Sequence, residues 1–166
     1  MRFSPDKQTA YDLIQKCTRQ ELEERFIKFG DIQPHKAKGY AQYIIKNRKD
    51  ERMKTTLGLR DIVREIRIND KILAVIFQVL RIVVNKELEQ VEIFMSKLPK
   101  LLQSGGRCAI ITFHSIEDRL VKYGFKELAE RNDMKLINKK VIKPHYTEVQ
   151  CNKASRTAKL RIIEKQ

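Results

Sequence analysis

The sequence predicts a mixed α/β fold, in which an all-helical N-terminal module over residues 1–68 precedes an α/β domain over residues 69–166. No segment of the first 67 residues has the pattern of a strand, whereas residues 107–113 form a near-continuous apolar run of strand length. A serine and two acids follow that run directly, which is a typical helix start. The order helix, buried strand, tight turn, helix favours a doubly wound α/β fold.

Four helices are expected in the N-terminal module. Thr18 and Glu21 have the spacing of a capping box, and Gly30 follows as a stop signal. Pro34 is suited to the first position of a helix, and Thr56 can cap another. The expected helices cover residues 9–17, 18–30 and 34–49, together with one that begins at Thr56.

The second part changes character at Asp70, which can cap a strongly apolar helix. The run at residues 107–113 fits a strand that is buried on both faces, as in a parallel sheet covered by helices. A helix is expected to start at Ser115. The remaining expected elements are helices over residues 70–84 and 87–102, strands over 134–143 and 158–164, and a surface loop over 144–157.

The charge of the chain points to a polyanionic partner. The formal net charge is +14, with 34% charged and 42% hydrophobic residues, so the chain can bury a core beneath a basic surface. Nucleic acid is the first candidate partner and an anionic membrane surface the second. A lysine-rich solvated surface without a partner is the alternative.

The sequence predicts neither a membrane segment nor a metal centre. The longest apolar stretch, residues 72–84, is interrupted by Gln78 and Arg81 and is too short to span a bilayer. The N-terminus does not resemble a signal peptide. The three cysteines lack metal-ligand spacing and are interpreted as reduced thiols, which favours a cytoplasmic location.

The segment Gly105–Arg119, GGRCAIITFHSIEDR, carries the candidate chemistry. The carboxyl end of a buried strand faces the crevice where α/β folds bind ligands, and here it presents a histidine, a hydroxyl, two carboxylates and a guanidinium. These groups could orient an amine acceptor, take up a proton or hold a phosphate. Alternatively, Ser115 only caps the helix and His114 is an ordinary turn residue.

This segment resembles the hallmark GGR–strand–FHS–EDR run of the ribosomal RNA small subunit methyltransferase H family. Three further stretches match in the same order: the Met1–Arg2 start, FQVLRIVVNKEL at residues 77–88, and NKASRTAKLRIIE at residues 152–164. The resemblance implies transfer of a methyl group from S-adenosylmethionine to the N4 amine of a cytidine in small-subunit ribosomal RNA. It also implies that residues 69–166 form the returning half of a partial Rossmann-like methyltransferase sheet and that residues 1–68 form a substrate-binding helical insert.

On this basis we expect His114, Ser115 and Asp118 to be the catalytic residues, with His114 or Asp118 accepting the proton of the amine. Phe113 and Phe3 are candidates to stack on a flipped cytidine. Basic stretches at residues 36–54 and 139–161 are expected to bind RNA phosphates. The individual side chains expected to contact RNA are Arg2, Arg81, Arg119, Arg156, Lys159 and Arg161.

The chain departs from the family pattern where the cofactor would bind. None of its six glycines forms a loop after a strand, and no acidic ribose-binding segment is present, so we expect no S-adenosylmethionine site in these 166 residues. Three interpretations follow. The chain is a truncated methyltransferase completed by a separate polypeptide that carries the cofactor-binding half, a catalytically dead RNA-binding module that contacts the small ribosomal subunit, or a fragment without an independent role.

Overall fold

The computed structural model describes residues 8–131 and 134–166, which belong to two compact units. The helical unit ends at Glu87, and the sheet unit begins at Leu88. The sequence placed the boundary at residues 68/69 instead. The difference arises because the long apolar helix α5 (Asp70–Asn85) packs against α1, α2 and α4 and so completes the helical unit.

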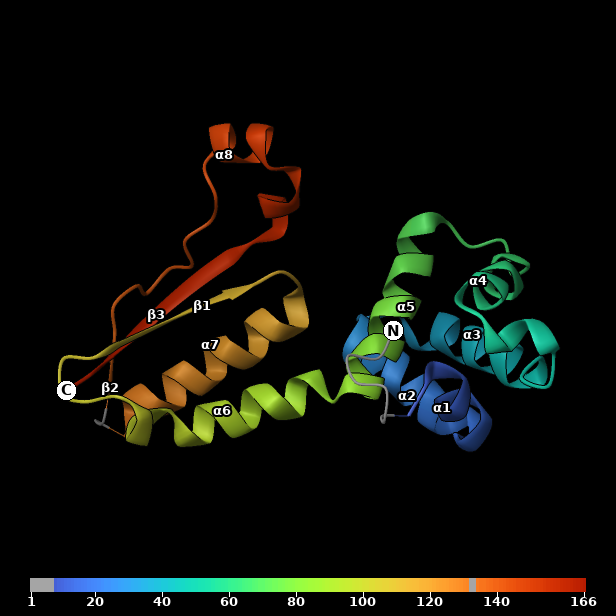
Figure 1. Cartoon of the computed structure of the whole chain (residues 1–166), viewed down its shortest axis with the longest axis horizontal. Coiled ribbons are helices and arrows are strands. Elements are labelled where there is room, and N and C mark those ends of the chain that lie inside the picture. The colour runs from blue at the N-terminus through green and yellow to red at the C-terminus, as the bar shows by residue number, and fades with distance from the viewer. Residues whose placement is uncertain (1–7, 132–133) are drawn as a thin grey trace. The chain divides into compact units, whose positions relative to one another are not determined.

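In its described residues, the helical unit contains only helices (Figure 1). Before α5 come α1 (Ala10–Lys16), α2 (Arg19–Gly30), α3 (Pro34–Lys46), the 3-10 helix η1 (Glu51–Lys54) and α4 (Thr56–Arg64). The predicted capping box of α2 is confirmed, since the Thr18 hydroxyl accepts the N–H of Glu21 and the Glu21 carboxylate accepts the N–H of Thr18. Both groups satisfy N–H donors that the first helical turn leaves unpaired.

Two other predicted caps were wrong by one residue. Thr56 and Asp70 are the first helical residues of α4 and α5, and the caps are the residues before them. The hydroxyl of Thr55 accepts the N–H of Gly58, and the side chain of Asn69 caps α5 in the same way. Adjacent residues with similar capping propensity cannot be distinguished by sequence pattern.

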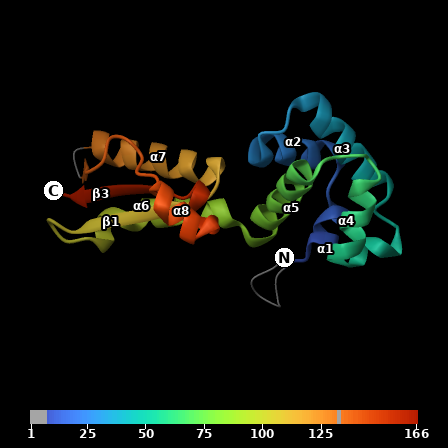
Figure 2. The same cartoon turned by 90° about the horizontal axis from the view of Figure 1, so that it is seen from above.

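The five α-helices of the helical unit lie close together (Figure 2), and each contributes apolar side chains to the core. Phe26, Ile44 and Ile62 are among its fully buried members. Helix α4 lies so close to η1 that a β-carbon built at Gly58 would be 2.1 Å from the carbonyl oxygen of Arg52. Only glycine, which lacks a β-carbon, therefore fits at position 58 in this packing.

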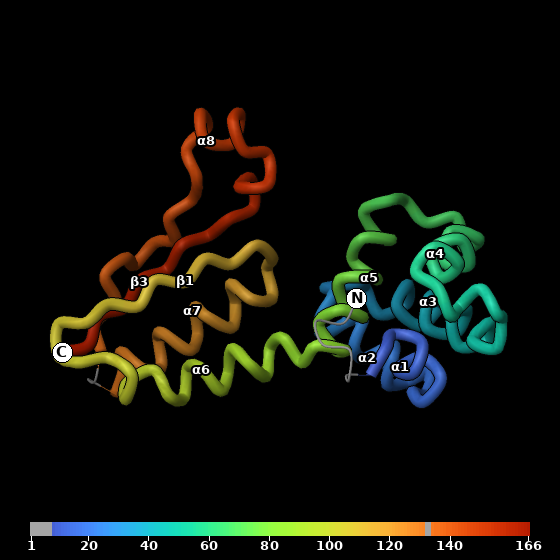
Figure 3. The backbone as a smooth tube through the Cα atoms, in the orientation of Figure 1, coloured from blue at the N-terminus to red at the C-terminus, as the bar shows by residue number. Residues whose placement is uncertain are grey.

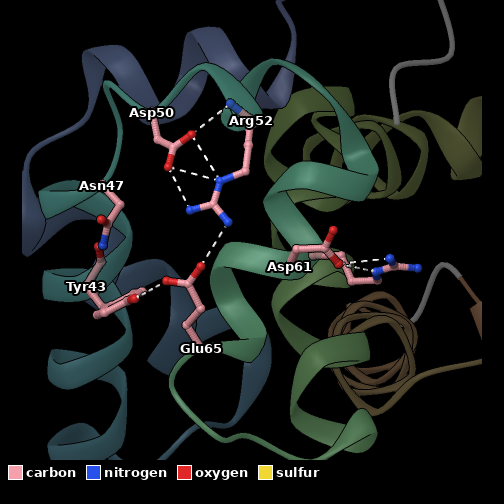
Figure 4. A network of polar contacts seen from close by, with 7 residues as sticks. Tyr43, Asn47, Asp50, Arg52, Asp61 and Glu65 are labelled. Atoms are coloured by element: carbon pink, nitrogen blue, oxygen red, sulfur yellow. Dashed lines mark hydrogen bonds and ion pairs between the residues drawn. The ribbon is translucent and has the colours of Figure 1, made fainter.

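A polar network joins η1 to α3 and the end of α4 on the surface of the helical unit (Figure 4). The Arg52 guanidinium binds both carboxylate oxygens of Asp50 and donates to Glu65 Oε1 at 2.9 Å. The Tyr43 hydroxyl donates to Glu65 Oε2 at 2.6 Å. The hydrogen bonds from Tyr43 and Arg52 lower the pKa of Glu65, so the carboxylate stays charged and Arg52 is fully engaged by acids.

The sheet unit consists of two long helices, a small sheet and a projecting segment. The three strands among its described residues have the order β1-β3-β2, and both pairings are antiparallel. The predicted last strand is confirmed as β3, whereas the strand expected over residues 134–143 is reduced to β2 and an isolated bridge at Ile142. The elements are α6 (Glu87–Leu101), β1 (Arg107–Thr112), α7 (Ser115–Glu130), β2 (Met134–Leu136), α8 (Tyr146–Cys151), η2 (Lys153–Thr157) and β3 (Lys159–Lys165).

Helices α6 and α7 cover a single face of this sheet (Figure 1). Cys108 and Ile110 of β1 pack towards the helices, whereas Ile111 is 58% exposed and Phe113, just after the strand, is 54% exposed. The prediction of a parallel strand buried on both faces was therefore wrong for the described strands. A continuous apolar run is compatible with double burial but does not require it.

The segment between β2 and β3 stands away from the sheet as an arm, residues 143–158 (Figure 3). The sequence predicted a surface loop over most of it, but it contains the short helices α8 and η2. Tyr146 is 72% exposed at the start of α8. In the described parts of the chain, no helix combines the length and apolar character that crossing a bilayer requires.

Candidate functional site

The candidate site lies where β1 ends and α7 begins. Strand β1 stops at Thr112, and His114 has extended backbone angles and is the N-cap of α7. Its Nδ1 accepts the N–H of Glu117 at 3.3 Å. The predicted start of the helix at Ser115 is confirmed, and Ser115 is the exposed first helical residue. The alternative role of Ser115 as the cap was wrong, because His114 is the cap.

His114 and Glu117 form a half-buried pair. The Nε2 atom of His114 lies 2.9 Å from Glu117 Oε1, and the two side chains are 13% and 24% exposed. Glu117 Oε2 also accepts the N–H of Phe113 at 3.2 Å. Burial opposes ionisation of Glu117, but the hydrogen bonds from His114 and Phe113 outweigh it and lower the pKa of the carboxyl. The lowered pKa favours the ionised form of Glu117, so the pair places a carboxylate beside an imidazole ring.

Asp118 binds two cations from β3. Its Oδ1 lies 2.8 Å from Nε of Arg161, and its Oδ2 lies 3.2 Å from both Nη2 of Arg161 and Nζ of Lys159. Burial would raise the pKa of Asp118, but the two cations more than compensate and lower it. An aspartate with a lowered pKa and two bound cations is a poor proton acceptor, and it holds the start of α7 against β3.

The structure brings together five of the predicted site residues. His114, Ser115 and Asp118 lie at the start of α7, and Lys159 and Arg161 reach them from β3. Asp118 carries one negative charge against the two positive charges of Lys159 and Arg161, so one positive charge remains.

The other predicted residues lie elsewhere. Arg119 is an exposed residue of α7, and Arg156 is exposed in η2 on the arm. Arg81 belongs to the helical unit, where its guanidinium binds Glu87 at 2.9 and 3.1 Å. Arg2 and Phe3 lie outside the described residues.

Glu117 was predicted as one of the two carboxylates of this segment but not as a catalytic residue, although it contacts His114 through both its backbone and its side chain. The available signal was the three-residue spacing from His114 to Glu117, which is the spacing of a capping box when histidine takes the place of serine. The prediction instead used the same three-residue spacing one residue further along the chain, from Ser115 to Asp118.

The basic stretches divide into engaged and solvent-facing side chains. In the helical unit, Arg48 donates to backbone carbonyls, Arg52 binds Asp50 and Glu65, and Lys54 binds Glu51. The remaining lysines of that stretch are exposed and form no ion pair within the described residues: Lys36, Lys38, Lys46 and Lys49. In the sheet unit the same holds for Lys139, Lys140, Lys143, Lys153 and Arg156.

Four cavities are lined by described residues of one unit or the other. One of about 450 Å³ lies in the helical unit, with Tyr11, Asp12 and Lys54 on its wall. In the sheet unit, a cavity of about 360 Å³ between α6 and α7 is lined by Glu92 and Glu127, and one of about 150 Å³ over the open sheet face includes Glu148. The fourth, of about 190 Å³, lies between α7 and the end of β2 and is lined by Lys122, Lys126, Lys139 and Arg161.

The glycines do not fit a nucleotide-type cofactor. Such a cofactor needs backbone without side chains directly after a strand, at the start of a helix. Gly105 and Gly106 precede β1, Gly30 and Gly124 lie against side chains of packed helices, and Gly58 lies against the Arg52 carbonyl. The sixth, Gly39, lies within α3. None of the six glycines, all of which lie in the described part of the chain, therefore occupies the position that a cradle of this kind requires.

Comparison with known proteins identifies the relatives of the chain. Proteins named ribosomal RNA small subunit methyltransferase H are 43% identical in Elusimicrobium minutum and 36% identical in Coprothermobacter proteolyticus, each over 99% of this chain. In Caldicellulosiruptor saccharolyticus the identity is 34% over 96% of the chain. The chain spans only 56–57% of the length of these relatives. The model of the MraW methylase family matches residues 1–166, and the chain belongs to that family.

Proposed function

We propose that this chain supplies the acceptor side of a methyltransferase that modifies the N4 amine of a cytidine in small-subunit ribosomal RNA, and that it does not methylate by itself. The observation that carries the proposal is the His114, Glu117 and Asp118 cluster at the end of β1, on a chain whose whole length matches relatives named for this activity. The lack of a glycine cradle supports the second part, because the methyl donor then needs residues beyond these 166.

Methyl transfer to an exocyclic amine is mostly a matter of position, and the amine loses one proton. His114 is the proposed acceptor of that proton. Because its Nδ1 accepts the Glu117 N–H, the neutral ring carries its hydrogen on Nε2, which is buried 2.9 Å from Glu117 Oε1 without the geometry of a hydrogen bond. The 3.3 Å bond to Nδ1 is long, so Nδ1 can exchange it for the amine proton, and the Glu117 carboxylate then stabilises the imidazolium.

Ser115 and Asp118 have supporting roles in this proposal. The exposed Ser115 hydroxyl, at the first position of α7, can orient the polar edge of the cytosine ring. Asp118 is a positioning residue, since its two cations hold the start of α7 on β3. Phe113, 54% exposed beside His114, offers an aromatic face for an extruded base.

The test combines this chain with a separate polypeptide that carries the cofactor-binding half of a relative. The chain alone should give no heat with S-adenosylmethionine in calorimetry and no methylation of small ribosomal subunits. The mixture should methylate them, and His114→Ala should reduce the rate by about 100-fold or more, as expected for loss of a proton acceptor.

His145→Ala is the matched control, because His145 is likewise the N-cap of a helix, α8, but lies outside the cluster. It should leave the rate of the mixture unchanged. Micromolar binding of S-adenosylmethionine to the chain alone would contradict the proposal, as would equal rates for the two histidine variants.

The alternative function is a catalytically dead RNA-binding module that contacts the small ribosomal subunit. The nine solvent-facing basic side chains described above favour RNA binding under either function. Since phosphate neutralisation releases counterions, the affinity for ribosomal RNA should fall steeply with salt. An inactive mixture with wild-type RNA affinity would favour this alternative.

A further inference from the structure

We propose that the cavity between α7 and the end of β2 is a phosphate-binding pocket for the backbone of the RNA, which adjoins the His114 cluster through the Arg161–Asp118 ion pair. The inference rests on the proposed function in one respect, namely that RNA is the source of the phosphate. The lining of this cavity includes Lys122 and Lys126 of α7, Lys139 after β2 and Arg161 of β3.

The positive charge of its lining distinguishes this cavity from the other three. Four cationic side chains surround about 190 Å³, and no carboxylate lines the pocket. The three other cavities described above each have at least one carboxylate on the wall. Lys126 has an acidic neighbour, Glu130 at 3.4 Å, but both side chains are more than 60% exposed, so this pair holds the ammonium only weakly.

Arg161 gives the pocket a fixed donor. Asp118 binds its Nε and Nη2 atoms, and the side chain is only 13% exposed, so the guanidinium is held in one orientation. Its Nη1 makes no hydrogen bond within the described residues and remains able to donate. Asp118 neutralises at most the charge of Arg161, so the three lysines of the lining keep the pocket positive.

The remaining walls suit a compact tetrahedral anion. Phe125 and Leu136 form an apolar floor, which lowers the local dielectric and strengthens the attraction of the cations for an anion. Asn138 also lines the pocket, but its amide already donates to the carbonyls of Lys140 and Leu160 and accepts the N–H of Ile162. The ligand is therefore recognised by charge, with Arg161 at the base and exposed lysines at the rim, which is typical of phosphate binding.

The first arm of the test uses inorganic phosphate as the probe. In NMR titrations of the 166-residue chain, saturable shifts are expected at the Arg161 Nε–H and at the backbone amides of the three rim lysines. They should disappear in the triple variant Lys122→Ala, Lys126→Ala, Lys139→Ala. Arg161 is left intact because its loss would leave Asp118 without its main partner. Shifts located elsewhere, or none, would overturn the pocket.

The second arm measures the salt dependence of affinity for a single-stranded ribosomal RNA oligonucleotide. The triple variant should lower the slope of log affinity against log salt by about 0.7, the contribution of one phosphate contact on a single strand. The matched control Lys97→Ala, Lys100→Ala, Lys135→Ala removes the same charge from exposed lysines of the sheet unit outside the pocket. It should lower the slope by less than half as much.

The two arms separate failure of this inference from failure of the proposed function. If the phosphate shifts are confined to the pocket but the two triple variants have equal salt slopes, the pocket does not bind the phosphates of RNA. RNA binding by the rest of the chain would not be affected by that outcome. Localised shifts in a wild-type chain that binds no RNA at any salt concentration would instead contradict the proposed function.

Discussion

The helical unit and the sheet unit differ in how completely each buries its apolar surface. In the described residues, the core of the helical unit contains eighteen buried side chains, whereas that of the sheet unit contains seven. The first unit encloses its core with helices on several sides. The second covers one face of its sheet and leaves Ile111, Phe113 and Ile142 exposed on or beside the rest. The candidate functional site therefore lies in the unit that buries its apolar surface less completely.

The largest expected effect compares Phe125→Ala in the sheet unit with Phe26→Ala in the helical unit. Both side chains are at most 1% exposed, and each truncation should cost about 3–5 kcal/mol. In a seven-residue core this loss should unfold the sheet unit, while the larger core should survive it. Amide hydrogen exchange measured by NMR should lose protection throughout residues 88–166 in the first variant only. Equal loss of protection in the two units would contradict the expected difference in stability between the two cores.

Within the helical unit, Gly58→Ala should destabilise by about 3 kcal/mol, because the new methyl group would collide with the Arg52 carbonyl. Gly39→Ala is the matched control, since a methyl group added at this position inside α3 would meet nothing within 4 Å. That change should stabilise by about 0.5–1 kcal/mol through helix propensity. Urea denaturation of both variants measures the difference, and similar midpoints would mean that η1 moves freely away from α4.

In the sheet unit, Asp118→Asn should lower the free energy of unfolding by about 2 kcal/mol at pH 7, since hydrogen bonds to two charged partners are lost. Because the folded-state pKa of Asp118 is lowered, its contribution is complete above the ordinary aspartate pKa of about 3.9. It is lost as the pH falls from there through the folded-state pKa. Wild type and variant should therefore converge in acid.

Asp70→Asn is the control for this pH series. Asp70 also pairs with an arginine, Arg64, but its side chain is 85% exposed, so the change should have little effect on stability at any pH. Thermal denaturation between pH 2 and pH 7 distinguishes the two aspartates. A constant difference between wild type and Asp118→Asn across that range would contradict the assignment of the shift to the ion pairs.

The smallest effect on stability is expected from Ile111→Lys on the open sheet face. Ile111 is 58% exposed, so the change should alter the free energy of unfolding by less than about 0.5 kcal/mol. It should nevertheless reduce self-association at high protein concentration, because it places a charge in an exposed apolar surface beside the free edge of β1. Leu57→Lys, at a site 64% exposed in the helical unit, should leave sedimentation unchanged.

The sequence predicted the helices more reliably than the sheet, for physical reasons. Capping and periodicity are local, so Thr18, Pro34 and the apolar face of α5 located their helices within a few residues. Strand direction and the covering of a sheet face depend on partners far away in the chain. The run at residues 107–113 has the same composition whether β3 pairs with it in parallel or antiparallel fashion.

The candidate site was predicted as a location but not as a set of contacts. His114, Ser115 and Asp118 do lie together at the end of β1. What local pattern cannot show is that Asp118 binds cations 41 and 43 residues further along the chain, or that Lys122, Lys139 and Arg161 line one cavity. Both arrangements follow from the antiparallel return of β3.

Strand β3 is fastened by an ammonium group at each of its ends. Lys159 reaches Asp118 at the start of α7, and Lys165 donates to the carbonyls of Pro99 and Leu102 at the end of α6, at 2.7 and 2.9 Å. A slip of β3 by two residues would preserve its alternation of side chains, yet it would carry both ammonium groups about 7 Å from their acceptors. The two lysines therefore fix the register of β3 in the sheet.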